Sequence, residues 1–236
     1  MAVRDISLTP RVEGTRDAHP VLKPVQFSLS EIEQHFTENM AEVKAQFGVA
    51  DNLKSEKNEI ACKMVWRSQV VLAEGLLDFY IHEISKYCLV RMFSGVWPKT
   101  DKYKSFQIPM EKVENAINAF ESNDWFFEYL NERFSRDVFL SCESMRDQLN
   151  LIGIHFNETM KMAFPSSNEQ EAIKIGKETI KMLFQRRNEI AHQNDRSHAS
   201  AQQSDITKEF VVDYISKIES IVNAIQKIAV ETDTKK

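Results

Sequence analysis

The sequence has few of the residues that interrupt helices. Its 236 residues include only six glycines and six prolines, and residues that favour helix, such as Glu, Lys, Ala, Leu and Gln, fill the segments between them. No segment shows the alternation of apolar and polar residues that is typical of a half-buried strand. We therefore predict an all-α protein built as a helical bundle, with no sheet.

Cysteines and long apolar runs are also scarce. The three cysteines, Cys62, Cys88 and Cys142, form no C-x-x-C pair, so buried thiols in a reducing compartment are expected rather than disulfides or metal ligands. No apolar run approaches the roughly 20 residues that cross a bilayer, and the first residues lack an apolar signal segment. We expect a cytoplasmic protein that does not contact a membrane.

Signatures of metal and cofactor enzymes are missing as well. The sequence contains no H-E-x-x-H, P-loop or glycine-rich phosphate loop, and no serine hydrolase elbow. Glu189 and His192 have the Glu-x-x-His spacing of di-iron bundles, but such sites need a second copy. None of the other five histidines follows a glutamate by three residues. We expect no metal and no cofactor.

The net charge of −5 limits how the chain could bind nucleic acid. Phosphate contacts dominate nucleic-acid affinity, so general duplex-binding proteins are more often basic. Any such contact must therefore be local. The basic residues that could supply it are Lys177, Lys181, Arg186, Arg187 and Arg196. The same residues could equally be the solvated face of a helix.

The domain organisation follows from the helical periodicity. Residues 1–27 contain three prolines and no sustained pattern, which predicts an extended or disordered arm. Residues 28–231 form one predicted all-α domain, and 232–236 a tail. Ser28 and Glu31 have the spacing of a capping box, and the helix that they start is predicted to end at Gly48, with a short turn over 51–55.

The second predicted helix, from about 56 to 93, is apolar around much of its girth, which places it at the centre of the bundle. The remaining apolar segments have helical spacing as well. They predict helices over 109–121, around 125–134, and over 141–163, 168–192 and about 205–231. The connection from 193 to 203 is polar and is predicted to be mobile.

The end of the 168–192 helix carries the residues that suggest chemistry. Asn188 and His192 are four residues apart and share one face, while Arg187 points about 140° from His192 and lies about 7.5 Å away along the axis. Arginine binds phosphate through its planar fork, and an imidazole that titrates near neutral pH moves protons. This set suits phosphodiester cleavage by a ribose 2′-hydroxyl.

The segment 187–192, Arg-Asn-Glu-Ile-Ala-His, resembles the Arg-polar-x-x-x-His signature of the HEPN superfamily. The segment 76–84 resembles the first core helix of its RNase LS and toxin-associated, RiboL-PSP-type branch, and the likeness extends in outline over about 58–230. The resemblance implies a metal-independent endoribonuclease with RNA as its substrate and a role in toxin–antitoxin or antiviral defence. It also implies a homodimer whose two motif helices line one cleft, and an antitoxin or other protein as a further partner.

In this hypothesis His192 is the general base or acid, Arg187 holds the phosphate, and Asn188 fixes the imidazole or contacts the sugar. Arg186 could replace Arg187 as the motif arginine, since its spacing also fits the looser family pattern. Glu74 or Asp78, on the predicted central helix, could orient Arg187. Alternatively, these two carboxylates belong to a row of surface pairs one turn apart.

Two alternatives to this hypothesis involve no catalysis. Cations collect in the last turn of helices because they complement the helix dipole and bond the free carbonyls, which would account for Arg186, Arg187 and His192 without any chemistry. The second alternative is a non-catalytic helical module that binds RNA, a nucleotide or a protein partner, because a fold does not establish a function.

Overall fold

The computed structural model describes residues 25–118, 124–196 and 201–234. Over these ranges the chain forms nine helices and no strand apart from an isolated bridge between Arg196 and Gln203, so the predicted all-α class is confirmed. The helices are α1 (Leu29–Ser55), α2 (Glu59–Phe93), α3 (Asp101–Lys104), α4 (Met110–Asn118), α5 (Asp124–Phe134), α6 (Cys142–Leu151), α7 (Phe156–Ala163), α8 (Glu169–Gln193) and α9 (Lys208–Thr234).

The start of the domain agrees with the prediction where it is described, whereas its end differs. Residues 1–24 of the predicted arm lie outside the described residues, and α1 starts at the predicted capping box of Ser28 and Glu31. Residues 232–234, predicted as part of a tail, are instead the last turn of α9. Arg91 on α2 forms an ion pair with Asp233 at 2.5 Å, and this contact extends the helix.

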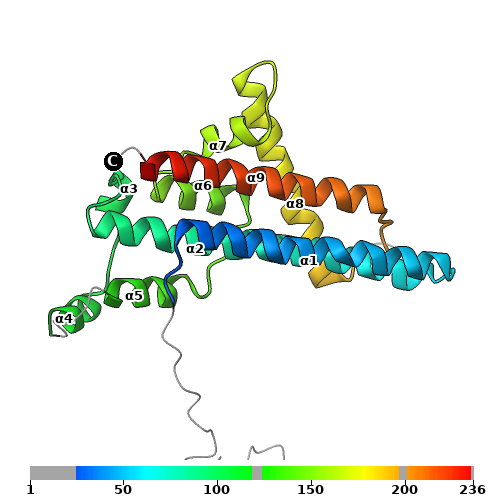
Figure 1. Cartoon of the computed structure of the whole chain (residues 1–236), viewed down its shortest axis with the longest axis horizontal. Coiled ribbons are helices and arrows are strands. Elements are labelled where there is room, and N and C mark those ends of the chain that lie inside the picture. The colour runs from blue at the N-terminus through cyan, green and yellow to red at the C-terminus, as the bar shows by residue number, and fades with distance from the viewer. Residues whose placement is uncertain (1–24, 119–123, 197–200, 235–236) are drawn as a thin grey trace, which may run out of the picture.

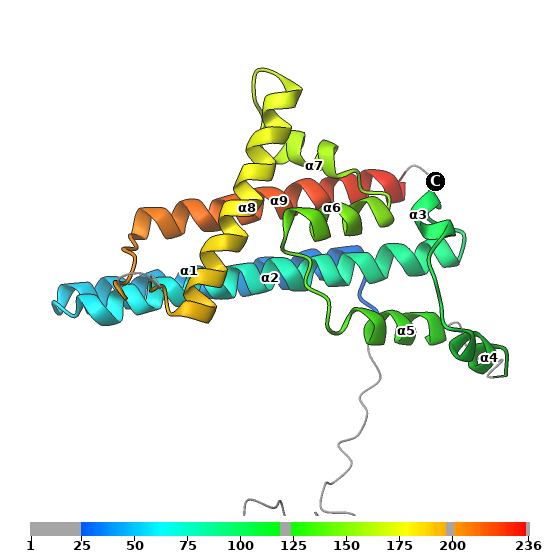
Figure 2. The same cartoon turned by 180° about the vertical axis from the view of Figure 1, so that it is seen from behind.

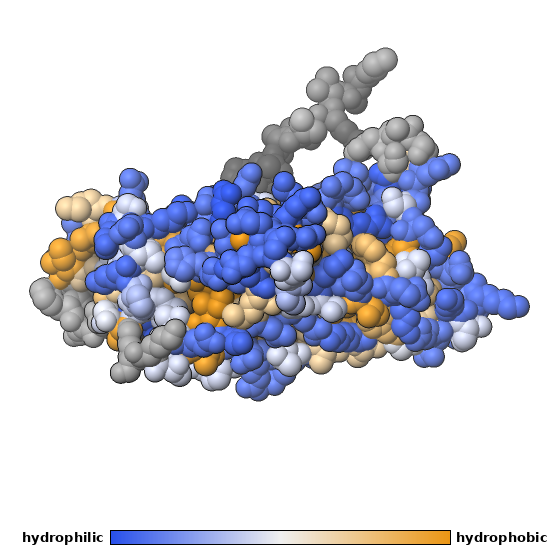
Figure 3. Space-filling model, turned by 90° about the horizontal axis from the view of Figure 1, so that it is seen from above, coloured by the Kyte–Doolittle hydropathy of each residue, from blue (hydrophilic) through white to orange (hydrophobic). Residues whose placement is uncertain are grey.

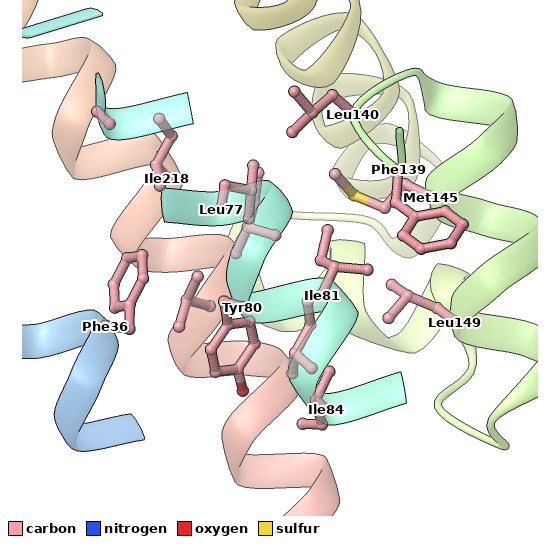
Figure 4. Close-up of a cluster of buried hydrophobic side chains, with 14 of the residues drawn as sticks. Phe36, Leu77, Tyr80, Ile81, Ile84, Phe139, Leu140, Met145, Leu149 and Ile218 are labelled. Carbon is pink, nitrogen blue, oxygen red and sulfur yellow. The ribbon is translucent and has the colours of Figure 1, made fainter. Parts of the chain in front are cut away.

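Helix α2 occupies the centre of the molecule, as its apolar girth predicts. Its side chains face two sets of neighbours (Figure 4), with Phe36 of α1 and Ile218 of α9 on one side and Met145 and Leu149 of α6 on the other. The buried residues of α2 in this cluster are Leu77, Tyr80, Ile81 and Ile84, each at most 1% exposed. Burying each side chain of this size contributes about 1.5–3 kcal/mol. Helix α2 therefore holds α1 and α9 on one side and α6 on the other in a single core.

Helices α1 and α2 form an antiparallel hairpin (Figure 1), and α1 is longer than predicted. The predicted helix end at Gly48 and the predicted turn over 51–55 are wrong, because α1 continues to Ser55. A glycine inside a helix costs about 1 kcal/mol relative to alanine. Burial of Ala50 and packing of Leu53 against the core offset that cost, and the chain reverses at Lys57, whose φ is 62°.

The segment predicted as one helix over 141–163 forms two helices, α6 and α7. The break falls at Gly153, whose φ of 79° places it in the left-handed region that glycine adopts without steric cost. The side chains of Trp97 and Thr100 bond the carbonyls of Ile152 and Leu151, at 3.0 and 2.8 Å. These tertiary hydrogen bonds satisfy the last carbonyls of α6 and end the helix there.

Helix α8 crosses the other long helices and carries the motif to the central one. It begins after Asn168, whose side chain caps Glu171, packs on α7, and reaches the N-terminal half of α2 at its far end (Figure 2). The face seen from above is mostly hydrophilic, with separate smaller hydrophobic areas (Figure 3). No helix in the described ranges has the length and apolar character to cross a bilayer.

The close contact between α7 and α8 depends on Gly176. A Cβ at this position would lie 2.6 Å from Met160 Sδ and 2.9 Å from Met160 Cβ, and Met160 is fully buried. We predict that Gly176→Ala lowers the free energy of unfolding by about 1–3 kcal/mol, the usual cost of overpacking. The matched control is Gly48→Ala, where an added Cβ meets nothing within 4 Å.

The control should raise the stability by about 0.5–1 kcal/mol, because alanine replaces glycine at an exposed helical position. Urea unfolding of both variants and the parent protein measures the two effects. Equal stabilisation by both changes would show that α7 and α8 are not in close contact.

Candidate functional site at the end of α8

The motif helix ends in a sharp reversal of the chain. Asn194 and Asp195 follow α8 with φ values of 50° and 61°, a left-handed conformation in which Asn and Asp are enriched among residues other than glycine. The backbone N–H of Asp195 donates to the carbonyl of Glu189 at 2.9 Å, which satisfies one of the last helix carbonyls. This reversal turns the Asp195 side chain back under the motif.

The Asp195 carboxylate is buried between two arginines from different helices. It accepts a hydrogen bond from Arg67 Nε of α2 at 2.7 Å and a bidentate pair from Arg186 of α8. Arg67 also donates to the Ser204 carbonyl at 2.7 Å. The predicted mobile connection over 193–203 is therefore wrong at Asp195, which is 1% exposed. Residues 197–200 of that connection lie outside the described residues.

The Arg186 side chain is held in place by Asp195 and by further contacts. Besides Asp195, its guanidinium donates to the Asp205 carbonyl at 3.2 Å and lies 5.6 Å from the centre of the Phe210 ring. Glu189 lies 3.5 Å from it on the same helix. An arginine held by a buried carboxylate, a carbonyl and an aromatic face has little capacity to bind a phosphate.

Arg187 is placed differently, although it is the next residue. One NH group donates to the Asn188 side-chain oxygen at 3.0 Å. Its Nε is buried, and no hydrogen-bond partner for it exists among the described residues. The structure thus places the Asn188 oxygen on Arg187 rather than on the imidazole, and part of the Arg187 fork remains available to a ligand.

His192 lies in the last turn of α8 and is exposed to solvent. Within the described part of the chain, no hydrogen bond holds its ring. Arg187 and His192 are five residues apart on a continuous helix, so they keep the separation of about 7.5 Å along the axis. Between them they offer a guanidinium and an accessible imidazole at one end of the bundle.

Glu74 meets the motif helix from α2. It is 1% exposed, and the hydroxyl of Tyr214 on α9 lies 3.2 Å from its carboxylate. Burial raises the pKa of Glu74 to about 7, while the Tyr214 hydrogen bond and the Arg187 charge act to lower it. Because Glu74 is buried, it does not belong to a surface row.

Asp78 lies one turn beyond Glu74 and serves a different segment. Its carboxylate accepts the backbone N–H of Phe139 at 2.8 Å, and His82 is 3.9 Å away on the same helix. Asp78 therefore fixes the chain that leads into α6. The structure brings Glu74 to the motif but not Asp78.

Three residues of the site were not found from the sequence: Arg67, Asp195 and Tyr214. Asp195 had the one usable signal, because the pair Asn194-Asp195 directly follows a helix, where residues tolerant of a left-handed conformation end the element. Tyr214 occupies a core position of α9 and is indistinguishable there from an apolar residue. Arg67 is one charged residue on the mostly apolar central helix, and nothing in the sequence links it to the motif.

Two hollows show where the surface is indented. One of about 410 Å³ lies beside the motif, between α2 and the end of α8, and its lining is Met64, Arg67, Ser68, Val71, Leu72, Ile190, Ala191 and Asn194. A larger one of about 1230 Å³ lies between the α3–α5 region and α6. Of the four cationic residues that line the larger hollow, Lys102, Lys112 and Arg133 are each paired with a carboxylate.

The described residues hold no cluster of three or more His, Cys, Asp or Glu side chains with the arrangement of a metal site. The arrangement that exists at the end of α8 consists of one arginine, one amide, one imidazole and a buried carboxyl group. These groups can bind an anion and transfer a proton.

The buried carboxylate of Asp195 should dominate the stability of this region. We predict that Asp195→Asn lowers the free energy of unfolding by about 3–5 kcal/mol, because Arg67 and Arg186 lose the charge that compensates their burial. The matched control is Asp213→Asn, which removes an exposed pair with Lys217 on α9 and should change the stability by at most about 1 kcal/mol. Denaturant unfolding that gives equal changes for the two variants would contradict the assignment.

One of the comparisons with known proteins found a match. The sequence model of the RiboL-PSP-HEPN family matches residues 26–231, which includes α1 through nearly all of α9. None of the curated proteins and none of the solved structures matches the chain with significance. The family is associated with nuclease or other RNA-related roles. The matched range covers most of the sequence, and the chain therefore belongs to the RiboL-PSP-HEPN family of the HEPN superfamily.

Proposed function

We propose that the protein is a metal-independent endoribonuclease. The observation that carries the proposal is the different use of two neighbouring arginines. Arg186 is held by Asp195, whereas Arg187 keeps a guanidinium that the fold uses only in part. It lies on the same helix end as the exposed His192. This difference favours Arg187 over Arg186 as the motif arginine.

The chemistry follows from these two groups. His192 takes the proton from the ribose 2′-hydroxyl, or gives a proton to the 5′-oxygen that leaves. The 2′-oxygen forms a bond to phosphorus while the bond from phosphorus to the 5′-oxygen breaks. The products are a 2′,3′-cyclic phosphate and a 5′-hydroxyl. Arg187 stabilises the negative charge that develops on the phosphate oxygens, and Asn188 holds Arg187 in place.

The reaction is better served by two proton-transfer groups, whereas one chain supplies one imidazole at the motif. A two-fold axis brings the same patch from both partners, so a homodimer would place two copies of Arg187 and His192 in one cleft. A surface suited to this assembly lies next to the motif. Exposed apolar residues follow one face of α2, namely Ile60, Met64, Leu72 and Phe79. We call this surface the α2 apolar face.

The α2 apolar face has two features that favour a second copy as its partner. Met64 and Leu72 also line the hollow of about 410 Å³ beside Ile190 and Ala191 of α8, so the face is continuous with the motif helix. Gly75 lies between Leu72 and Phe79, and a Cβ there would meet nothing within 4 Å. Nothing in the described ranges of a single chain requires this glycine, whereas two helices that approach closely would.

The biological setting in the proposal is that of the family. We propose a cytoplasmic enzyme that acts on RNA in toxin–antitoxin or antiviral defence, with an antitoxin or another protein as a regulator. The acidic net charge of −5 requires that RNA be bound locally, at the motif, rather than over the whole surface.

A non-catalytic module that binds RNA, a nucleotide or a protein partner is the second candidate. The observation that favours it is the lack, among the described residues, of any group that orients the His192 ring. Catalytic imidazoles are usually fixed in one tautomer by a second hydrogen bond. Cleavage assays distinguish the two candidates.

The first functional prediction concerns the two motif residues. His192→Ala and Arg187→Ala should each lower the rate of RNA cleavage by at least about 100-fold, as removal of a general acid or base or of a transition-state charge does. Cleavage should persist in the presence of EDTA, and DNA should not be cut because it lacks the 2′-hydroxyl. Gel assays with an end-labelled RNA, and analysis of the ends for a cyclic phosphate, provide the measurement.

The matched controls are His155→Ala and Arg146→Ala. Both residues are exposed; His155 makes no side-chain capping bond to α7, and Arg146 of α6 lies 3.7 Å from the carboxylate of the adjacent Asp147. Both variants should cleave RNA at the parent rate. Activity that survives His192→Ala, or that disappears with EDTA, would rule out the mechanism.

The second functional prediction concerns the dimer. Leu72→Glu places a charge on the α2 apolar face and should convert a dimer into a monomer and abolish cleavage. Val230→Glu is the matched control, since Val230 has a similar exposure, 42% against 46% for Leu72, on the last turns of α9. Sedimentation velocity at micromolar concentration measures both variants. A monomeric parent protein would refute the dimer, and a dimeric Leu72→Glu variant would place its interface elsewhere.

A further inference from the structure

A buried polar cluster lies behind the motif arginine. Glu74 from α2 and Tyr214 from α9 meet at 3.2 Å, with 1% and 0% of their surfaces exposed. The Tyr214 hydroxyl also lies 2.8 Å from the carbonyl of Leu183 on α8. Leu183 precedes Arg187 by four residues, so in the helix its carbonyl is the acceptor of the Arg187 backbone N–H. The cluster therefore contacts the turn of α8 that carries Arg187.

The number of protons in this cluster constrains the state of Glu74. A tyrosine hydroxyl has one proton to donate, and two oxygens lie within hydrogen-bond distance of it. The Leu183 carbonyl is the nearer one and can only accept. If Tyr214 donates to that carbonyl, Glu74 can bond the hydroxyl only by donating a proton of its own. The arrangement that satisfies all three groups is a chain of donors from protonated Glu74 to Tyr214 to Leu183.

Arg187 is the other group whose state depends on Glu74. Its Nε is buried without a hydrogen-bond partner in the described residues, and its charge acts on the Glu74 carboxyl group. An ionised Glu74 would offer this guanidinium a carboxylate inside the protein. A protonated Glu74 offers no charge, so the guanidinium retains its capacity to bind an external anion.

We infer that Glu74 and Tyr214 are positioning residues for Arg187, with protonated Glu74 leaving the guanidinium available to an RNA phosphate and ionised Glu74 drawing it into the protein. The inference rests on the proposed function for the identity of the ligand. It goes beyond that function because it makes phosphate binding depend on the protonation of a residue that does not touch the substrate.

The groups around Glu74 determine the direction of the pH dependence. Burial raises its pKa to about 7 and is the largest effect; the Tyr214 hydrogen bond and the Arg187 charge lower it, and the Asp78 charge raises it. Burial also raises the pKa of Tyr214 far above neutral, so Tyr214 stays protonated throughout. Glu74 therefore loses its proton as the pH rises through about 7. Phosphate binding should weaken over the same range.

The test measures binding of a fluorescent, non-cleavable 2′-O-methyl RNA oligonucleotide to His192→Ala protein, because this variant removes any contribution of the imidazole to binding. Between about pH 6 and about pH 8 the dissociation constant should rise by up to about tenfold, the largest effect that one group of this pKa can produce. With Glu74→Gln in addition, binding should stay tight and nearly independent of pH, because the amide mimics the protonated carboxyl group. An unchanged pH dependence in the Glu74→Gln double variant would overturn the inference.

A second measurement does not depend on RNA. In NMR titrations of the side-chain carboxyl carbons, with Glu74 identified by its absence from the Glu74→Gln spectrum, Glu74 should titrate near pH 7. Arg187→Gln should raise its pKa, since it removes an effect that lowers it. An ordinary pKa near 4.5, or a pKa that Arg187→Gln leaves unchanged, would overturn the inference. Loss of RNA binding alone, with the NMR result as expected, would refute only the proposed function.

Discussion

The carboxylate of Asp195 joins segments that are far apart in the sequence, since it binds Arg67 of α2 and Arg186 of α8 at once. Without this carboxylate, the positive charges of Arg67 and Arg186 would lie close together in a largely buried environment. The pair also fixes the rotation of α8 about its axis. Adjacent residues on a helix point about 100° apart, so the anchoring of Arg186 on one side also sets the direction in which Arg187 leaves the helix.

The helices with strong apolar periodicity could be predicted from the sequence, and α2, α8 and α9 are found close to the expected ranges. Two of the errors in the helix boundaries occurred at glycines. Gly48 lies inside α1, whereas Gly153 separates α6 from α7. The two positions differ in their tertiary contacts, because Trp97 and Thr100 bond the carbonyls just before Gly153. The local sequence does not show these tertiary partners. It therefore cannot distinguish a glycine inside a helix from a glycine at which a helix ends.

The same limit applies to the site. The motif could be found because Arg187, Asn188 and His192 lie within two turns of one helix, where spacing determines proximity. The residues that give the motif its environment come from much farther away, as with the 128 residues between Arg67 and Asp195 and the 140 between Glu74 and Tyr214. Over such separations, spacing in a single sequence carries no information on contact.

The crossing of α8 over α2 and α9 (Figure 2) means that the motif is completed by helices on either side of it in the sequence. The last two turns of α8, grafted onto another bundle, would bring along Arg187, Asn188 and His192. The buried carboxyl group of Glu74 and the phenol of Tyr214 would stay behind. The motif residues could therefore be moved to another protein, whereas the electrostatic environment of Arg187 depends on the whole fold.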